Sequence, residues 1–126
     1  MLQKEEYRNK ILLGDALSVL KQMPDESVDC VMTSPPYCGL RTYNTEPKIW
    51  GGDNNCEHYF STTNTCSKCH VWKGELGLEP TPELFVQHLC DVFSEVKRVL
   101  KDSGCCFVNL GDTYGGSGKH DCKNHP

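Results

Sequence analysis

Apolar positions in the first part of the chain predict a strand, a helix and a second strand. The run NKILLGD, residues 9–15, is apolar up to its Gly-Asp end and predicts a buried strand that leads into a turn. Residues 16–22 carry apolar side chains at helical spacing and stop before Pro24. VDCVMT, residues 28–33, predicts a second buried strand. Strand, helix and strand within about twenty-five residues are typical of a parallel βαβ unit.

A long amphipathic helix and a third strand follow later in the chain. Thr81 suits the N-cap of this helix, and the proline after it suits the first helical position. Apolar residues then recur at helical spacing to Lys101, and we expect the helix to end in KDSG with Gly104 as its terminator. CCFVNL, residues 105–110, predicts a buried strand, and we expect residues 111–126 to form a flexible polar tail.

The segment between residues 34 and 79 breaks this periodicity. Gly, Asn, Thr, Pro, Cys and His replace the apolar repeats there. A structureless stretch of this length is unusual inside a compact domain unless it is functional or cross-linked. Its composition therefore points to a cross-link or to a bound group.

Four residues of metal-ligating types occur in this segment at two short spacings. Cys-x-His is followed, after seven residues, by Cys-x-x-Cys, and this donor set suits tetrahedral Zn²⁺. The four candidates are Cys56, His58, Cys66 and Cys69. His70 could compete with His58, and a redox dithiol or a chance cluster is the alternative to zinc. Four protein ligands leave no open position, so we expect structural rather than catalytic zinc and interpret residues 39–80 as a zinc-binding insertion.

Composition and charge narrow the class of protein. The chain has 126 residues, which favours one domain, and its 37% hydrophobic content includes nine cysteines, so the apolar core is thin. The net charge is −4 and no basic run occurs, which argues weakly against non-specific binding of nucleic acid. The N-terminus has no signal-peptide pattern and no window approaches 18 apolar residues, so we expect a cytoplasmic protein without a membrane partner.

The cysteine count is odd, and in a reducing compartment clustered Cys and His favour metal ligation over disulfides. The cysteines within the predicted helix and strands should be small buried hydrophobes. These are Cys30, Cys90, Cys105 and Cys106. We expect Cys38 to serve packing and His88 to be a surface or partly buried residue of the long helix.

The tetrapeptide Ser34-Pro35-Pro36-Tyr37 directly follows the second predicted strand. In parallel α/β sheets, ligands bind at this edge. Consecutive prolines stiffen the turn and leave backbone carbonyls that can accept hydrogen bonds from a ligand. A hydroxyl and a carbonyl suit an exocyclic amine with two N–H donors, and an aromatic ring can stack on a base, a contact worth about 1–3 kcal/mol. The alternative is a rigid turn with a packed aromatic ring.

The run ILLGDALSVLKQMPDESVDCVMTSPPY resembles the opening of amino-group DNA methyltransferases, which use S-adenosylmethionine to methylate N4 of cytosine or N6 of adenine. The similarity continues through GLRTY, WGGD, LGLEPTPELFVQHLCDVFSEVKRVLK and NLGDTYGGSGK. The resemblance implies an α/β fold, a partial Rossmann-like methyltransferase core with parallel strands and flanking helices, here with a zinc-stapled loop insertion. Adenine-directed members more often have Asp or Asn in place of the motif serine, so N4 of cytosine is favoured over N6 of adenine.

The resemblance also implies roles for individual residues. The catalytic motif would consist of Ser34, Pro35, Pro36 and Tyr37. Ser34 and the Pro35 carbonyl would hold the target amine, and Tyr37 would stack on a base flipped out of double-stranded DNA. Asp15 matches a carboxylate near the cofactor, with a plain helix N-cap as the alternative, and Asp112 could line the same pocket.

One element of such enzymes has no counterpart here. They carry a glycine-rich F-x-G-x-G loop near the cofactor, and GGSGK, residues 115–119, neither replaces it nor fits a phosphate loop. We therefore expect residues 1–126 to be the N-terminal, catalytic-motif part of a bacterial, archaeal or phage methyltransferase, whether engineered, naturally truncated or split from a complementary C-terminal half. The sequence leaves open whether residues 1–126 are active by themselves. The alternatives are an inactive fragment and a non-catalytic zinc-binding module that contacts nucleic acid or protein through residues 39–75.

Overall fold

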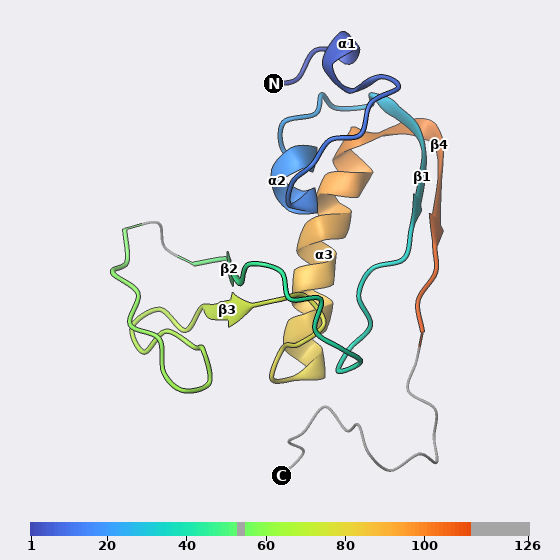
Figure 1. The fold of residues 1–126 in the computed structure, drawn as a ribbon. Helices are drawn as coiled ribbons and strands as arrows, with labels where there is room; N and C mark the ends of the chain where they lie inside the picture. The colour runs from blue at the N-terminus through green and yellow to red at the C-terminus, as the bar shows by residue number, and fades with distance from the viewer. Residues whose placement is uncertain (53–54, 112–126) are drawn as a thin grey trace. The chain divides into compact units, whose positions relative to one another are not determined.

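The computed structural model describes residues 1–52 and 55–111 (Figure 1). The elements in chain order are α1 (Lys4–Tyr7), α2 (Ala16–Leu20), β1 (Val28–Thr33), β2 (Lys48–Trp50), β3 (Trp72–Gly74), α3 (Pro82–Val99) and β4 (Leu100–Val108). The described chain divides into two compact units, Met1–Pro35 with Leu89–Asn109, and Pro36–His88 with Leu110 and Gly111. Helix α3 therefore contributes its beginning to the second unit and its remainder to the first.

A parallel pair of strands forms the sheet of the first unit. β1 and β4 run in the same direction, and the register places Thr33 opposite Val108. The Asn109 N–H donates to the Thr33 carbonyl oxygen at 2.9 Å. This pairing confirms the strand predicted over residues 28–33 and the mixed α/β architecture with parallel strands.

Helix α3 passes directly into β4, which corrects the predicted end of the helix. The helix ends at Val99 rather than Lys101, and Gly104 lies within the strand instead of terminating the helix. The register shifts near the start of β1, as at a β-bulge. A Cβ at position 104 would lie 2.7 Å from the Leu100 side chain and 3.0 Å from the Asp29 carbonyl oxygen, so the irregular segment needs glycine.

The strand predicted over residues 9–15 is wrong. Ile11 and Leu13 lie outside any strand and are 99% and 101% exposed. A strand needs a hydrogen-bonded neighbour, and across the described ranges β1 pairs with β4 while β2 pairs with β3. Asp15 instead caps α2, since its Oδ1 accepts from the Ser18 N–H at 2.9 Å and from the Ser18 hydroxyl at 2.7 Å.

Four cysteines that the pattern predicted to be buried are exposed. They are Cys30, Cys90, Cys105 and Cys106. Cys30 lies opposite Cys105 in the register of the parallel pair, and Met32 and Phe107 on the same strands are exposed as well. A two-stranded sheet gives each strand only one neighbour, so apolar character alone did not place the three strand cysteines in a core, and Cys90 lies at an exposed position of α3.

Helix α3 begins where its capping signal predicts. The Leu84 N–H donates to Thr81 Oγ1 at 3.3 Å, as expected for an N-cap. Phe85, Val96 and Val99 are the buried apolar side chains of the helix, and their spacing places them on one face. No helix in the described part of the chain has both the length and the hydropathy for crossing a bilayer.

Arg98 joins the end of α3 to the turn that precedes β1. Its Nη1 donates to the Met23 carbonyl at 2.9 Å and its Nη2 to the Leu20 carbonyl at 2.7 Å. The same guanidinium contacts the carboxylates of Asp25 and Glu95, and these bonds, chiefly the one to Asp25, raise the pKa of Arg98. The planar donor fork thus binds carbonyls at and just after the end of α2, and at Leu20 it adds to the hydrogen bond from the Met23 N–H at 2.9 Å.

We predict that Arg98→Ala lowers the free energy of unfolding by about 1–3 kcal/mol, because it removes two partly buried hydrogen bonds and two ion pairs. Urea denaturation followed by circular dichroism measures the change. Lys97→Ala, at an exposed position of the same helix, should stay within about 0.5 kcal/mol of the parent. Equal effects of the two substitutions would contradict this role of Arg98.

Candidate functional site

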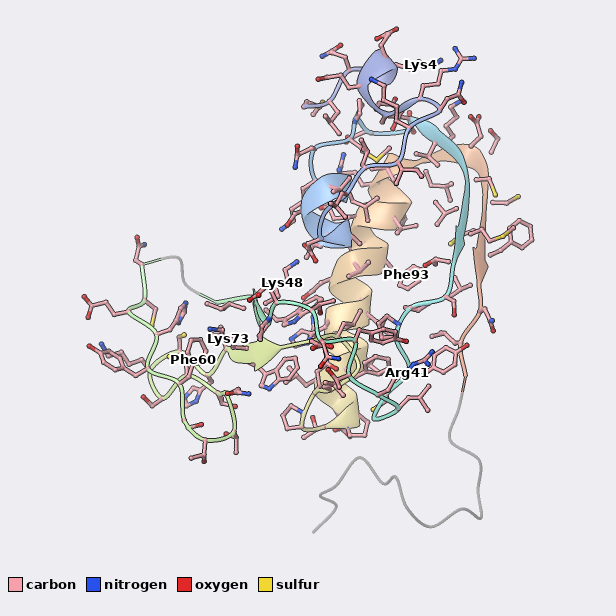
Figure 2. All side chains as sticks on the ribbon, in the orientation of Figure 1. Lys4, Arg41, Lys48, Phe60, Lys73 and Phe93 are labelled. Atoms are coloured by element: carbon pink, nitrogen blue, oxygen red, sulfur yellow. The ribbon has the colours of Figure 1, made fainter. Side chains whose placement is uncertain are left out.

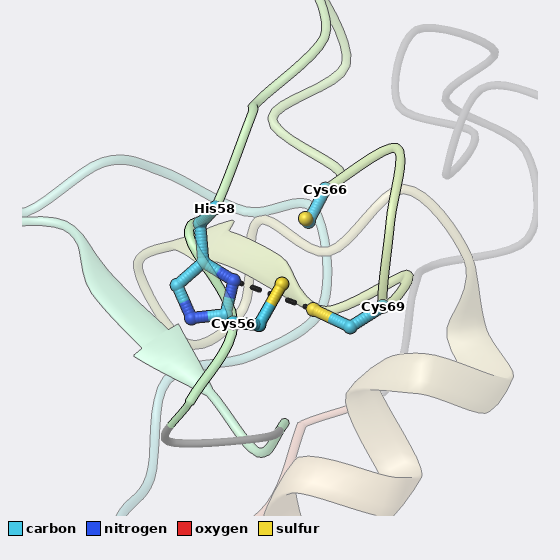
Figure 3. A group of neighbouring side chains, drawn as sticks. All are labelled: Cys56, His58, Cys66 and Cys69. Carbon is cyan, nitrogen blue, oxygen red and sulfur yellow. Dashed lines mark hydrogen bonds between the residues drawn. The ribbon is translucent and has the colours of Figure 1, made fainter.

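The four predicted metal ligands lie together in the second unit (Figure 3). One ligand atom from each of Cys56, His58, Cys66 and Cys69 lies within 4.8 Å of the others. His58 directs Nδ1 toward the Cys69 Sγ, 3.3 Å away. A tetrahedral zinc–thiolate site with bonds of about 2.3 Å spaces its ligands about 3.8 Å apart. A small contraction of the cluster would therefore enclose such an ion.

A tight turn after Cys66 presents two of the sulfurs. The Cys66 N–H donates to the Val71 carbonyl at 2.8 Å, and the His70 N–H donates to the Cys66 carbonyl at 3.0 Å. The Lys68 N–H points at the Cys66 Sγ from 3.4 Å. Backbone donors aimed at sulfur favour the thiolate, which is the form that ligates metals.

His58, rather than His70, supplies the imidazole of the cluster. His70 adopts the left-handed conformation, with φ +60°, and takes part in the turn through its backbone. The His58 ring lies near Phe60, with centroids 5.6 Å apart, and the Lys73 ammonium lies 5.6 Å from the Phe60 ring centroid (Figure 2). The structure thus selects between the two histidines that the sequence left open.

The thiols of the cluster differ in acidity before a metal binds. Backbone hydrogen bonding from Cys69 is the largest of the contributions that lower the pKa of Cys66 to about 5, with further help from Lys68 and His58. Burial, followed by hydrogen bonds with Cys69 and Cys66, raises the pKa of Cys56 to about 11. At neutral pH, Cys66 is therefore a thiolate and Cys56 a thiol.

The Ser34-Pro35-Pro36-Tyr37 motif leaves the carboxyl end of β1, as the sequence predicted. Ser34 is exposed, and the three residues after it are half-buried. The Tyr37 ring packs against Gly111, where a Cβ would lie 2.6 Å from the ring Cε2. The motif therefore emerges at the sheet edge at which parallel α/β proteins bind ligands.

The structure describes one of the two candidate cofactor carboxylates. Asp15 is exposed and caps α2, so the N-cap interpretation of this residue is confirmed. Asp112 lies outside the described residues, as does the predicted flexible tail after Gly111.

A buried carboxylate–histidine pair went unpredicted. His88, expected at or near the surface, is 3% exposed, and its Nδ1 lies 2.8 Å from Oε1 of Glu79. The rings of Trp50 and Trp72 stack near His88, at centroid distances of 4.6 and 5.8 Å. The sequence contains one signal of this burial, because His88 follows the buried Phe85 by three residues and shares its helix face.

A family model and several known proteins match most of this chain. The model of a DNA methylase family matches residues 28–125. Type II methyltransferase M.XycI of Xanthomonas campestris pv. cyanopsidis is 41% identical over 101 residues, which are 80% of this chain and 25% of that protein. M.Cfr9I of Citrobacter freundii is 40% identical over the same shares of the two chains, and M.SmaI of Serratia marcescens is 32% identical over 87% of this chain and 28% of its own. The chain therefore spans about a quarter of the length of these relatives, and no solved structure matches it.

We predict that the affinity of the cluster for a thiophilic divalent metal rises with pH between about 6 and 9. Cys56, with a pKa of about 11, must lose a proton to bind, which makes affinity rise about tenfold per pH unit for that proton. Cys66, with a pKa of about 5, is already ionised in this range and adds no such dependence. Co²⁺ titration followed by thiolate-to-metal absorbance tests this, and an affinity independent of pH would contradict it.

Proposed function

The chain belongs to the DNA methylase family, whose model covers residues 28–125, and from this we propose that it carries the catalytic-motif part of an enzyme that transfers a methyl group from S-adenosylmethionine to an exocyclic amine in DNA. The observation that carries the proposal is the position of Ser34-Pro35-Pro36-Tyr37 directly after β1. Because the chain spans about a quarter of its relatives, the activity is proposed for the polypeptide to which these residues contribute.

The motif residues would orient the target amine. The Ser34 hydroxyl and the Pro35 carbonyl provide two acceptors for the two N–H donors of the amine, and two prolines hold the backbone in one conformation. The Tyr37 ring would stack on a base flipped out of double-stranded DNA. S-adenosylmethionine, when bound, supplies an electrophilic methyl group. The contribution of the chain is orientation, exclusion of water and hydrogen-bond acceptors for the reacting amine.

We propose N4 of cytosine as the target in preference to N6 of adenine. The support is the serine at position 34, where adenine-directed members of the family more often carry Asp or Asn. A hydroxyl both accepts and donates hydrogen bonds, whereas an ionised carboxylate only accepts them, so the two kinds of motif offer the amine different surroundings. Adenine N6 is the alternative target.

We propose Asp15 and Asp112 as cofactor-binding residues. The Asp15 carboxylate caps α2 through Oδ1, and a carboxylate can accept several hydrogen bonds, as cofactor binding would require. Asp112 directly follows Gly111, which packs against the Tyr37 ring. A glycine-rich F-x-G-x-G segment, the usual contact of such enzymes with the cofactor, would complete the site, in a complementary C-terminal part of the enzyme.

We propose that the four-residue cluster holds a structural zinc ion. Four ligands of fitting chemistry converge within 4.8 Å, and a site filled by protein atoms leaves no position for substrate. Structural zinc contributes on the order of 10 kcal/mol in small modules. The ion would thus hold the polar insertion of residues 39–80, in which the described strands β2 and β3 have only three residues each.

Methyl transfer tests the role of the motif. The full chain is incubated with radiolabelled S-adenosylmethionine and duplex DNA, with and without a polypeptide that supplies the C-terminal part of a relative, and the DNA is digested to nucleosides. We expect label in N4-methylcytosine. Tyr37→Ala should lower the rate about 5- to 150-fold, which corresponds to the loss of a stacking contact of about 1–3 kcal/mol, whereas Tyr37→Phe should stay within about threefold.

Ser34→Ala should lower the same rate, and Ser61→Ala, at an exposed loop position, is its matched control. Unchanged transfer by Ser34→Ala would overturn the assigned role of the hydroxyl. Label in N6-methyladenine would replace the proposed target with the alternative one. Zinc at one equivalent combined with no cofactor binding in isothermal titration, even with the C-terminal part present, would favour the non-catalytic zinc-binding module.

We also predict that Cys66→Ser abolishes zinc retention, while His70→Ala retains about one equivalent. Cys66 is fully buried at the cluster, whereas His70 takes part in the turn through its backbone. Elemental analysis after purification without chelator measures the metal content. Less than a tenth of an equivalent in the parent protein would count against the zinc site, and loss of zinc in His70→Ala would show that the wrong histidine has been assigned.

A further inference from the structure

Glu79 is a buried carboxylate with two specific partners. Its side chain has no exposed surface, and its Oε1 lies 2.8 Å from Nδ1 of His88, which is 4% exposed at the side chain. Its Oε2 accepts the Gly77 N–H at 2.7 Å. Burying a polar pair costs desolvation that a well-packed apolar pair would avoid. The pair therefore contributes something that apolar packing does not, and the position of Gly77 indicates what that is.

The His88 ring is itself held by two tryptophan rings. The Trp50 ring stacks on it at 4.6 Å and the Trp72 ring lies 5.8 Å away, both inclined by 20°. Trp50 Nε1 donates to the Gly74 carbonyl at 3.1 Å, which fixes that ring in turn. The imidazole thus has little freedom to turn away from the Glu79 carboxylate, and it fixes the carboxylate in one orientation.

Gly77 links the buried pair to the catalytic motif. Its carbonyl accepts the Gly39 N–H at 2.7 Å, and its φ of +95° lies in the region that favours glycine. A Cβ at this position would lie 2.9 Å from the Tyr37 carbonyl oxygen and 3.1 Å from the Pro36 Cβ. Gly77, whose N–H donates to Glu79, therefore lies directly against the backbone of the motif.

We propose that Glu79 and His88 are positioning residues, which act through Gly77 to hold the loop of Pro36 to Gly39 in the conformation that presents the Tyr37 ring. His88 fixes the Glu79 carboxylate, the carboxylate fixes Gly77 through its N–H, and the Gly77 carbonyl fixes the motif loop through the Gly39 N–H. The identity of the group that stacks on the Tyr37 ring rests on the function proposed above. The contacts from His88 through Glu79 and Gly77 to the motif loop do not depend on that function.

Hydrogen exchange at single amides of the zinc-supplied full chain tests the link. In the parent protein the N–H groups of Gly77 and Gly39 should exchange at least tenfold more slowly than unprotected amides, because both are hydrogen-bonded at 2.7 Å. The Cys66 N–H, bonded elsewhere in the same unit, is the internal reference. Unprotected exchange at Gly77 and Gly39 while Cys66 stays protected would overturn the proposal without any variant.

Substitutions then separate positioning from general stability. Glu79→Leu removes both acceptors at similar volume and should speed exchange at Gly77 and Gly39 at least tenfold, shift the Tyr37 ring signals and leave Cys66 within twofold. Glu79→Gln keeps an amide oxygen for the Gly77 N–H and should restore protection to within about threefold. Glu83→Gln, at an exposed position of α3, should change none of these values. Equal acceleration at all amides, or no change at Gly39, would contradict the proposal.

His88→Phe provides a second variant in case Glu79→Leu does not fold. It keeps an aromatic ring against the two tryptophans but loses the bond to Glu79, and we expect faster exchange at Gly77 with Cys66 unchanged. Methyl transfer is measured on the same samples. If the parent transfers no methyl group while the exchange pattern holds, the proposed function fails and the positioning role stands; if transfer occurs but is equal in Glu79→Leu and the parent, the positioning role fails alone.

Discussion

The hydrogen bonds of the buried Glu79 carboxylate are the constraint on which the motif loop of the second unit depends. They tie together the beginning of α3, the turn after β3 and, through Gly77, the backbone that follows the second motif proline. The surrounding apolar core is small, with two tryptophans as its largest side chains. Directional hydrogen bonds therefore do much of what packing does in larger domains, which is to hold the chain in one conformation. These hydrogen bonds thereby determine the conformation of the motif loop.

The sequence predicted the elements whose signals are local. The strand over residues 28–33 is found as expected, and Thr81 caps α3 as its residue type suggests, because strand propensity and capping depend on a few neighbouring residues. The metal-ligand set is found together because the Cys-x-x-Cys spacing itself defines a tight turn. The choice of His58 over His70 required the structure, because it depends on which imidazole lies beside the three cysteine sulfurs.

The failed predictions concern features that depend on partners distant in the sequence. NKILLGD has the composition of a strand, yet strand formation needs a hydrogen-bonding neighbour, which residue order does not reveal. Gly104 has the composition of a helix terminator, but the pairing with β1 drew the preceding residues into β4. The sequence predicts a surface or partly buried position for His88. Its burial depends on Glu79 and on two tryptophans from the β2–β3 hairpin.

The register of the parallel pair has a practical consequence for handling the protein. Cys30 and Cys105 are direct neighbours across β1 and β4, Cys106 adjoins them, and all three thiols are exposed. Exposed thiols oxidise readily, and a two-stranded sheet also offers unpaired edges to other chains. Without a reductant, the sheet is therefore one surface at which separate molecules would become covalently cross-linked, and storage under reducing conditions protects the strand that leads into the motif.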